Sequence, residues 1–162
     1  AYPRIVKVFE EFTGFSGRNY KPVKSLEMED AEIAIMVLGS TAGTVREVVK
    51  KLREKGEKVG TISLTLYRPF PQDELKELLK GVKVLAVMDR SYSFGSPGAQ
   101  LFMDVASTLV NMKEKPLLFN VIYGLGGRDL LPRHVVDIVK KAKEYAEKEE
   151  VSEKEVWVGV RE

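Results

Sequence analysis

The sequence predicts an α/β domain whose mostly parallel sheet is covered by helices on both faces. Short apolar runs such as IAIMVL and VKVLAV alternate along the chain with longer segments in which apolar residues recur at helical spacing. Turns rich in glycine or proline separate these segments, as the connections of an α/β fold require. The organising stretch is residues 82–98, in which a buried strand leads to a charged pair and a Ser/Gly turn before the next helix.

The first part of the chain predicts a helix, an edge strand and one strand-to-helix unit. Residues 4–12 carry apolar side chains at helical spacing, and the turn residues in 13–19 predict a linker. Residues 23–28 are half polar, which is typical of an edge strand, whereas residues 33–38 are continuously apolar and predict a buried strand. A helix follows the glycine-rich turn at residues 39–44.

The rest of the chain repeats the strand-to-helix unit. Pro71 suits the first turn of a helix, because proline lacks the N–H group that a helix start leaves unbonded. Residues 132–148 show the pattern of a long amphipathic helix. The other expected elements are strands at residues 59–66, 82–87, 116–122 and 156–160 and a helix at residues 99–110. The strands that we expect to be central and mostly buried are residues 33–38, 82–87 and 117–121.

Composition excludes several classes of protein. The 162 residues suffice for one domain, and the net charge is only +2 because basic and acidic residues are interleaved, which argues against nucleic-acid binding. The absence of Cys excludes disulfides and cysteine-ligated metal sites within these residues. The apolar runs fall far short of the roughly 20 residues of a membrane span, and no signal-peptide pattern opens the chain, so we expect a cytoplasmic protein without membrane contact. Abundant Lys and Glu with little Asn and Gln favour a thermophilic source.

Two glycine-rich turns could cradle a phosphate, because glycine lets the backbone approach an anion and a following helix points N–H groups at it. The candidates are Gly39, Ser40, Gly43 and Thr44 in the first turn and Gly124, Gly126 and Gly127 in the second. The alternative for the first turn is a tight connection in which Ser40 or Thr41 caps the helix. The alternative for the second is a surface turn whose glycines only supply positive φ.

Other side chains give no self-contained active site. His134 is the only histidine, and its place at the start of a helix favours a capping role over catalysis. No GxSxG motif and no metal-ligand cluster is present in the sequence. The residues alone therefore predict a binding or scaffold domain of α/β class.

The ordered motifs GRNYKPV, MEDAEIAIMVLGSTAGT, VREVVKKLREKGEKVGTISLTLYRPFP, VKVLAVMDRSYSFGSPG and YGLGGRD resemble the C-terminal half of the alpha subunit of 2-oxoacid:ferredoxin oxidoreductases, above all pyruvate synthases. The resemblance extends from Gly17 to the end of the chain. It implies a three-layer α/β/α sandwich similar to the transketolase C-terminal domain, with a mostly parallel five-stranded sheet. Residues 23–28 would be its one antiparallel edge strand. A receiver-type signalling domain is disfavoured, because Gly39 and Ser40 stand where such a domain has acidic residues.

The resemblance also implies an activity shared among chains. Such enzymes oxidatively decarboxylate pyruvate to acetyl-CoA and pass the electrons to ferredoxin, with thiamine diphosphate, magnesium and iron–sulfur clusters held by other domains and subunits. Residues 1–17 would then be a helix and linker from an upstream domain, and residues 18–162 a non-catalytic structural and subunit-contact domain, inactive alone. Two alternatives remain open: the same role for a branched-chain 2-oxoacid, and a free-standing phosphate- or nucleotide-binding module.

A subunit-contact surface is predicted after two of the strands. Arg68 and Phe70 follow one strand, whereas Asp89, Arg90 and Tyr92 follow another, and the carboxyl ends of parallel strands meet at one rim. Arg and aromatic side chains tend to anchor interfaces, although Asp89 and Arg90 could instead form an ion pair that ties the strand end to its loop. We expect Phe70 and Tyr92 to be at least partly exposed in the isolated chain.

Overall fold

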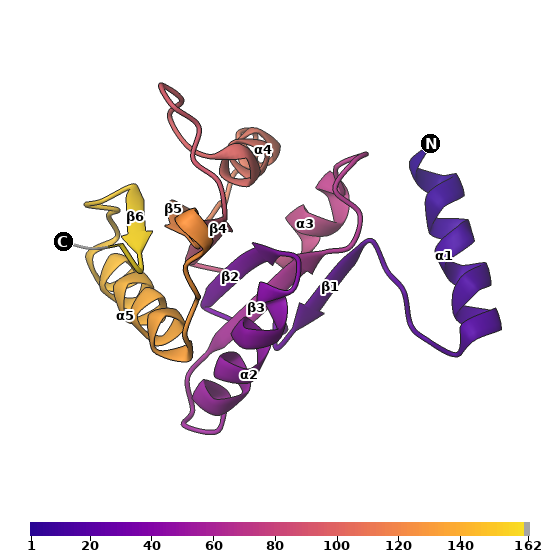
Figure 1. The fold of residues 1–162 in the computed structure, drawn as a ribbon, viewed down its shortest axis with the longest axis horizontal. Helices are drawn as coiled ribbons and strands as arrows, with labels where there is room; N and C mark the ends of the chain where they lie inside the picture. The colour runs from indigo at the N-terminus through magenta and orange to yellow at the C-terminus, as the bar shows by residue number, and fades with distance from the viewer. Residues whose placement is uncertain (161–162) are drawn as a thin grey trace.

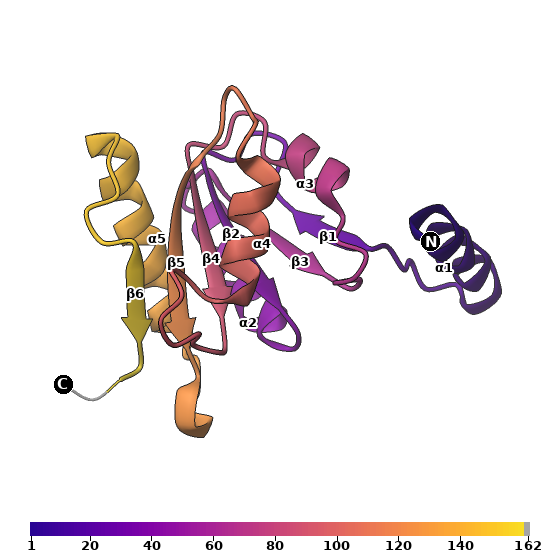
Figure 2. The same ribbon diagram turned by 90° about the horizontal axis from the view of Figure 1, so that it is seen from above.

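The computed structural model describes residues 1–160 and confirms the predicted α/β class (Figures 1 and 2). Within these residues, six strands form one sheet in the order β1-β3-β2-β4-β5-β6. The strands are β1 (Val23–Leu26), β2 (Ile33–Leu38), β3 (Val59–Leu64), β4 (Val84–Asp89), β5 (Leu117–Tyr123) and β6 (Glu155–Val158). The helices are α1 (Tyr2–Ser16), α2 (Thr41–Arg53), α3 (Gln72–Leu78), α4 (Gln100–Leu109) and α5 (Pro132–Lys148), with a 3-10 turn, η1, at Leu125–Gly127.

The sheet changes its winding direction between β2 and β4. β1 pairs with β3 in antiparallel fashion, as predicted for the edge strand, and the other neighbouring strands pair in parallel. From β2 the chain winds outward to β3 on one side and then returns to β4 on the other. Such a switch leaves a crevice outside the carboxyl ends of the two strands, where open α/β sheets bind ligands.

Helices cover both faces of the sheet, with α2 and α5 on one side and α3 and α4 on the other (Figure 1). Because side chains alternate along a strand, Ile35 and Val37 of β2 join the apolar cluster beneath α2 and α5, whereas Ala34 and Met36 join the cluster beneath α3 and α4. β2, β4 and β5 lie inside the sheet, which confirms the predicted central strands. No helix in the described part of the chain is long and apolar enough to cross a membrane.

α1 is longer than predicted and ends at Ser16. The hydroxyls of Thr13 and Ser16 donate hydrogen bonds to the carbonyl oxygens of Phe9 and Phe12, so these turn-forming residues continue the helix. Gly17 then adopts a positive φ of 68° and ends it. The linker expected from residue 13 therefore begins at Gly17.

The sheet has one strand more than the resemblance implies. The additional strand is β6, which the apolar residues at 156–160 predicted. It pairs with β5, and Val156 and Val158 pack against the apolar cluster beneath α5. β6 thus extends the sheet because its valines find a place in an existing core.

Candidate functional site

A cavity of about 370 Å³ lies at the topological switch of the sheet. Its walls come from the carboxyl ends of neighbouring parallel strands and the loops that follow them. They include Gly39, Ser40 and Thr41 after β2, Tyr67 after β3, Arg90 after β4 and Tyr123 of β5. The loops after β3 and β4 therefore meet at one edge, as the sequence predicted.

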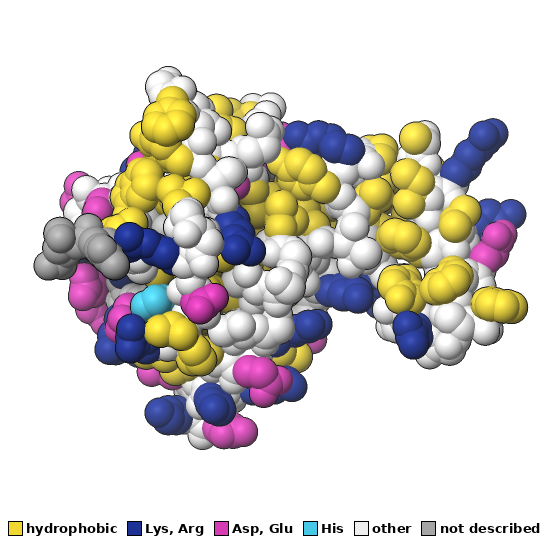
Figure 3. Space-filling model, in the orientation of Figure 1, with side chains coloured by type: hydrophobic (Ala, Val, Ile, Leu, Met, Phe, Trp, Pro, Cys, Tyr) yellow, Lys and Arg dark blue, Asp and Glu magenta, His cyan; other side chains and the backbone are white. Residues whose placement is uncertain are grey.

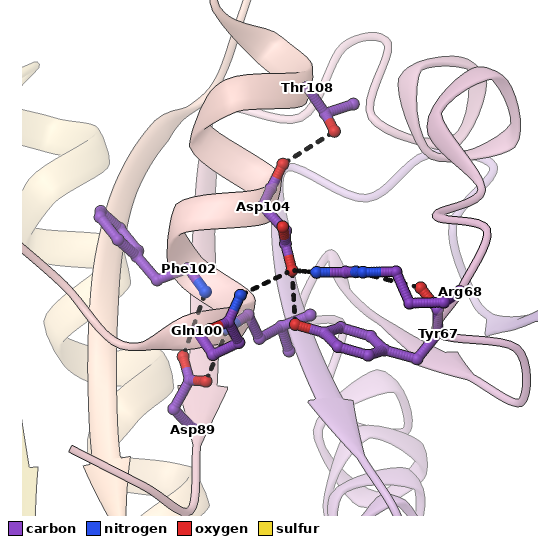
Figure 4. A network of polar contacts seen from close by, with 8 residues as sticks. Tyr67, Arg68, Asp89, Gln100, Phe102, Asp104 and Thr108 are labelled. Atoms are coloured by element: carbon purple, nitrogen blue, oxygen red, sulfur yellow. Dashed lines mark hydrogen bonds and ion pairs between the residues drawn. The ribbon is translucent and has the colours of Figure 1, made fainter. Parts of the chain in front are cut away.

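Asp89 ends β4, two residues beyond the predicted strand, and is only 5% exposed. One carboxylate oxygen accepts a hydrogen bond from the N–H of Leu101 at 2.8 Å. The other accepts from the N–H of Phe102 at 3.2 Å (Figure 4) and from Nδ2 of Asn120 at 2.9 Å. Burial raises the pKa of Asp89, and these donors oppose the rise because they stabilise the ionised form. Asp89 holds the start of α4 and so belongs to the interior rather than to the expected contact surface.

Asn120 of β5 completes this buried network. Its Oδ1 accepts a hydrogen bond from the N–H of Ala99 at 2.8 Å, and its Nδ2 also donates to the carbonyl of Val87 at 3.0 Å. In the described part of the chain, every buried side-chain nitrogen or oxygen has a hydrogen-bond partner. Asn120 was not among the residues expected to form the site, although a lone amide within the apolar run PLLFNVI is a signal for such a role.

Arg90 is exposed at the mouth of the cavity. Its side chain lies against Gly124, where a Cβ atom would come within 3.0 Å of Nε of Arg90. Gly124 also has a φ of 68°, which favours glycine. Within residues 1–160, Arg90 forms no ion pair with Asp89, so the ion-pair alternative is wrong.

A polar network joins the loop after β3 to α4 (Figure 4). The hydroxyl of Tyr67 donates a hydrogen bond to the carboxylate of Asp104, and Arg68 forms an ion pair with the same carboxylate at 2.7 Å. The guanidinium of Arg68 also lies 4.2 Å from the ring centroid of Tyr67. Burial acts to raise the pKa of Asp104, but the hydrogen bonds from Tyr67 and Arg68 outweigh it and lower that pKa. Arg68 thus fixes its loop to α4 while its side chain stays 51% exposed.

Phe70 and Tyr92 are both half-buried, which confirms their expected partial exposure. Phe70 contacts the ring of Tyr67 edge to face, with centroids 5.9 Å apart, and packs against the apolar cluster beneath α3 and α4. It therefore contributes to the packing of its own domain. A role in subunit contact stays a prediction for Arg68, Phe70, Arg90 and Tyr92.

Tyr92, Phe94 and Trp157 form an exposed aromatic cluster. The ring centroid of Tyr92 lies 5.1 Å from that of Phe94 and 4.9 Å from that of Trp157. Phe94 is 92% exposed and Trp157 is 39% exposed. Tyr92 was predicted from the sequence but this cluster was not, because the contact with Trp157 depends on where β6 joins the sheet.

The two glycine-rich turns do not converge on one anion site. In the first turn, Gly39 and Ser40 line the cavity, whereas Gly43 and Thr44 lie inside α2. In the second turn, Gly124 lies beneath Arg90, and Gly126 and Gly127 are exposed in η1. A phosphate cradle thus remains a prediction for the first turn only at Gly39 and Ser40.

Of the two predicted helix caps, the cap by His134 is formed, whereas the cap by Ser40 or Thr41 is not. Ser40 is the N-cap residue of α2, but its side chain makes no capping hydrogen bond, and the hydroxyl of Thr41 instead accepts one from Tyr123 at 3.1 Å. His134 does cap its helix, because Nδ1 accepts a hydrogen bond from the N–H of Leu131 at 3.2 Å.

The side chains of residues 1–160 do not form a ligand set for the magnesium ion of thiamine diphosphate or for an iron–sulfur cluster. The sequence contains no Cys, and the described residues hold no group of three or more His, Asp or Glu side chains placed to bind a metal. Asp89 borders the switch cavity, but its oxygens already accept hydrogen bonds from Leu101, Phe102 and Asn120.

Comparison with known proteins gives a consistent result. Residues 31–135 match the family described as pyruvate:ferredoxin oxidoreductase core domain II. The PorA subunit of pyruvate synthase from Pyrococcus abyssi is 42% identical over 97% of this chain and 40% of its own length. The corresponding subunit from Thermotoga maritima is 46% identical over 83% of this chain and 33% of its own length. The VorA subunit of ketoisovalerate oxidoreductase from Pyrococcus horikoshii is 39% identical over 94% of this chain and 39% of its own length.

The chain therefore spans about two fifths or less of the length of these curated relatives. Two solved structures share its fold. A 2-oxoglutarate:ferredoxin oxidoreductase from Magnetococcus marinus, with 2-oxoglutarate, coenzyme A and succinyl-CoA bound, superposes with a TM-score of 0.57 at 22% identity over 82% of this chain and 21% of that chain. A split-gene transketolase, an inactive tetramer, superposes with a TM-score of 0.59 at 20% identity over 78% of this chain and 44% of that chain.

Proposed function

Because this chain belongs to the pyruvate:ferredoxin oxidoreductase family through core domain II, we propose that it is a non-catalytic structural and subunit-contact domain of a pyruvate:ferredoxin oxidoreductase. The complete enzyme would oxidatively decarboxylate pyruvate to acetyl-CoA and pass the electrons to ferredoxin. The observation that carries this proposal is the similarity to pyruvate synthase subunits over nearly the whole chain. Pyruvate is favoured over a branched-chain 2-oxoacid by a small margin, because the pyruvate synthase subunits reach 42% and 46% identity whereas the ketoisovalerate subunits reach 39% and 41%.

The proposed enzyme divides its chemistry among chains. Thiamine diphosphate, magnesium and the iron–sulfur clusters would be held by other domains and subunits, with coenzyme A and ferredoxin used by the assembled enzyme in the cytoplasm. Residues 1–17 would connect this domain to an upstream domain, and residues 18–162 would form the transketolase C-terminal-like domain. In support, Asp89 is already bound by backbone and amide donors and so is not free to hold a metal ion.

The proposed contact surface combines Arg68, Phe70 and Arg90 with the aromatic cluster, which contains Tyr92. Arg68 and the cluster are exposed in part, and Phe94 almost completely, so these side chains are accessible to a partner. The network with Asp104 orders Arg68 before any partner arrives, which lowers the entropy lost on binding. Ordered arginine and aromatic side chains are the residue types that dominate binding energy in protein interfaces.

Reconstitution tests this function. The chain is combined with the thiamine-binding domain and the iron–sulfur subunits of the same enzyme, and pyruvate-dependent reduction of ferredoxin is measured with coenzyme A present. We expect activity only when the chain is included, and a lower rate when 2-oxoisovalerate replaces pyruvate. Full activity without the chain would contradict the proposal, and faster turnover of 2-oxoisovalerate would favour the branched-chain alternative.

A free-standing phosphate- or nucleotide-binding module is the second candidate. The cavity of about 370 Å³ beside Gly39, Ser40 and Arg90 favours it. Calorimetric titration with inorganic phosphate, thiamine diphosphate, coenzyme A and ATP distinguishes the two functions. Binding of one of these by the isolated chain, lost in Arg90→Ala, would favour the module, whereas no binding together with successful reconstitution would favour the subunit-contact domain.

A further inference from the structure

A basic recess of about 370 Å³ lies at the outer edge of the sheet, beside β1. Its polar lining contains three cationic side chains and two neutral ones that can donate hydrogen bonds, namely Lys21, Lys24, Arg46, Asn19 and Ser25. Among the described residues, no acidic one lines this recess. Figure 3 shows basic side chains on this part of the surface, between the body of the domain and α1. We call this cavity the β1 recess.

The fold brings the cations of the β1 recess together from two elements. Because side chains alternate along a strand, Val23 of β1 joins the apolar cluster beneath α3 and α4, whereas Lys24 lies on the other face, which α2 and α5 cover. α2 carries Arg46, which is exposed and lines the same recess. The carbonyl oxygen of Pro22 accepts a hydrogen bond from the N–H of Thr65 at 2.8 Å, which fixes the entry to β1 beside the end of β3.

Lys24 is held in place before any ligand arrives. Its ammonium group lies 5.3 Å from the ring centroid of Tyr20, which is a cation–π contact. The ring of Tyr20 in turn contacts the ring of Phe12 of α1 edge to face, with centroids 5.3 Å apart. An ordered cation loses less entropy when it binds an anion than a freely moving cation does.

A second charged recess, of about 380 Å³, differs from the β1 recess because its lysines are already paired. There Glu32 forms ion pairs with Lys58 at 3.2 Å and with Lys83 at 2.6 Å, and Glu57 forms one with Lys143 at 2.8 Å. Within residues 1–160, the three cations of the β1 recess form no ion pair. Their like charges repel one another, and an anion bound between them would remove this repulsion.

We propose that the β1 recess binds a small phosphate-bearing molecule, with Lys21, Lys24 and Arg46 around its anionic oxygens. A phosphate group carries a charge of about −1.5 to −2 at neutral pH and several acceptor oxygens, which suits three cations and two neutral donors better than a single carboxylate does. The volume of the recess falls within the roughly 300–1,000 Å³ of small-molecule sites. The ligand is therefore a phosphate ester or a diphosphate rather than the inorganic ion.

The β1 recess is separate from the switch cavity beside Arg90, because the two share no lining residue. The proposal therefore rests neither on the proposed function nor on its phosphate-binding alternative. Reconstitution of ferredoxin reduction tests the proposed function independently of this site.

Calorimetric titration of the 162-residue chain with pyrophosphate, at low and at high salt concentration, tests the β1 recess. We expect binding that weakens as the salt concentration rises, because the contacts are ionic. Lys24→Gln combined with Arg46→Gln should raise the dissociation constant at least about tenfold, since the double variant loses two charge-assisted contacts. Circular dichroism checks that this variant is folded.

Lys113→Gln combined with Lys115→Gln is the matched control, because it removes the same charge from the turn before β5. Both lysines are exposed and form no ion pair within the described residues. This control should change the dissociation constant by less than about twofold. Equal losses of affinity in the two double variants would show that net charge alone attracts the anion and would overturn the proposal.

Arg90→Ala distinguishes the β1 recess from the switch cavity and should leave the affinity for pyrophosphate unchanged. Loss of affinity in Arg90→Ala, with none in the double variant of the recess, would place the anion in the switch cavity and contradict the proposal. Titration with a polyglutamate peptide is the last arm. Failure of the native chain to bind pyrophosphate would overturn the proposal, and binding of the peptide instead would assign the recess to an acidic protein partner.

Discussion

The two helices that begin at the switch edge, α4 and α2, start in different ways. The first turn of α4 is held by Asp89, whose carboxylate accepts hydrogen bonds from the N–H groups of Leu101 and Phe102. The first turn of α2 has Ser40 at its N-cap without a side-chain hydrogen bond, and no acidic residue lies in that turn. The interior of the domain therefore fixes one helix start with its own buried groups and leaves the other bordering the cavity.

This difference shows that strand ends which look alike in the sequence serve different purposes. Both β2 and β4 lead into turns that contain Gly and Ser, and both turns border the same cavity. Only the end of β4 also delivers a buried carboxylate, which Asn120 of β5 supports with a hydrogen bond. The hydrogen bonds of Asp89 thus hold the start of the loop after β4 in place, whereas Phe94 farther along this loop is exposed to solvent.

The largest expected effect comes from a charge placed in the centre of the sheet, because strands of this sheet lead into both helix starts. Val84 of β4 is fully buried, so Val84→Asp places an unpaired charge in the centre of the sheet and should cost about 5 kcal/mol, enough to unfold the domain. Circular dichroism and thermal melting measure this loss. Val110→Asp is the control, because Val110 is 61% exposed and should tolerate the charge. A soluble Val84→Asp variant with an unchanged melting temperature would show that the sheet assignment is wrong.

Variants of the capping residues test whether the starts of α4 and α2 differ in stability. Asp89→Ala leaves the N–H groups of Leu101 and Phe102 and the amide of Asn120 without their acceptor, which should cost about 3 kcal/mol. Ser40→Ala at the start of α2 removes no capping bond and should cost less than about 0.5 kcal/mol. Urea unfolding of both variants gives the two values. Equal losses would mean that the two helix starts are equivalent after all.

The network of Asp104 should make part of the stability depend on pH. Its pKa is lowered in the folded state, so its contribution is complete above the unfolded pKa of about 3.9 and is lost as the pH falls through the lower folded value. Asp104→Asn should therefore cost about 1 kcal/mol at pH 7, and the difference from the native chain should shrink in acid. Glu144→Gln is the control, because Glu144 is exposed and the described residues give it no ion pair. A difference that grows in acid would contradict this account.

The smallest effect on stability should come from the tip of the β4 loop. Phe94 is 92% exposed, so Phe94→Ala should change the free energy of unfolding of the isolated chain by less than about 0.5 kcal/mol. In the reconstituted enzyme, the same change and Arg90→Ala should weaken assembly, which pull-down by a tagged partner subunit measures. Loss of folding with normal assembly would make these residues structural and would remove them from the contact surface.

The sequence predicted the strands and long helices well, because continuous apolar runs and helical spacing report burial directly. Residues 132–148 are α5 as predicted, and the runs at 33–38 and 117–121 fall in β2 and β5. The extent of α1 was missed, because the hydroxyls of Thr13 and Ser16 hydrogen-bond within the helix instead of ending it.

The site was predicted less completely, because its roles depend on contacts between distant segments. A charged pair after a strand predicts an exposed edge, and Arg90 is exposed there, but the sequence does not show that the start of α4 folds over Asp89. In the same way, Tyr92 and Trp157 are far apart along the chain and meet only because β6 pairs with β5. The residue types thus predicted that functional side chains lie at this edge of the sheet. The topology of the chain decides which of these side chains are buried.

The pairing of β1 has a consequence for the order in which the chain folds during synthesis. β1 pairs with β3 rather than with β2, so Val23 has no strand partner until Leu64 has been made. β2 and β3 can pair earlier and then offer an edge to which β1 is added, since a contact between distant segments forms more slowly than one between near segments. α1, which the linker ties to β1, is therefore made before every strand of the sheet but is joined to a completed edge only after β3 has been made.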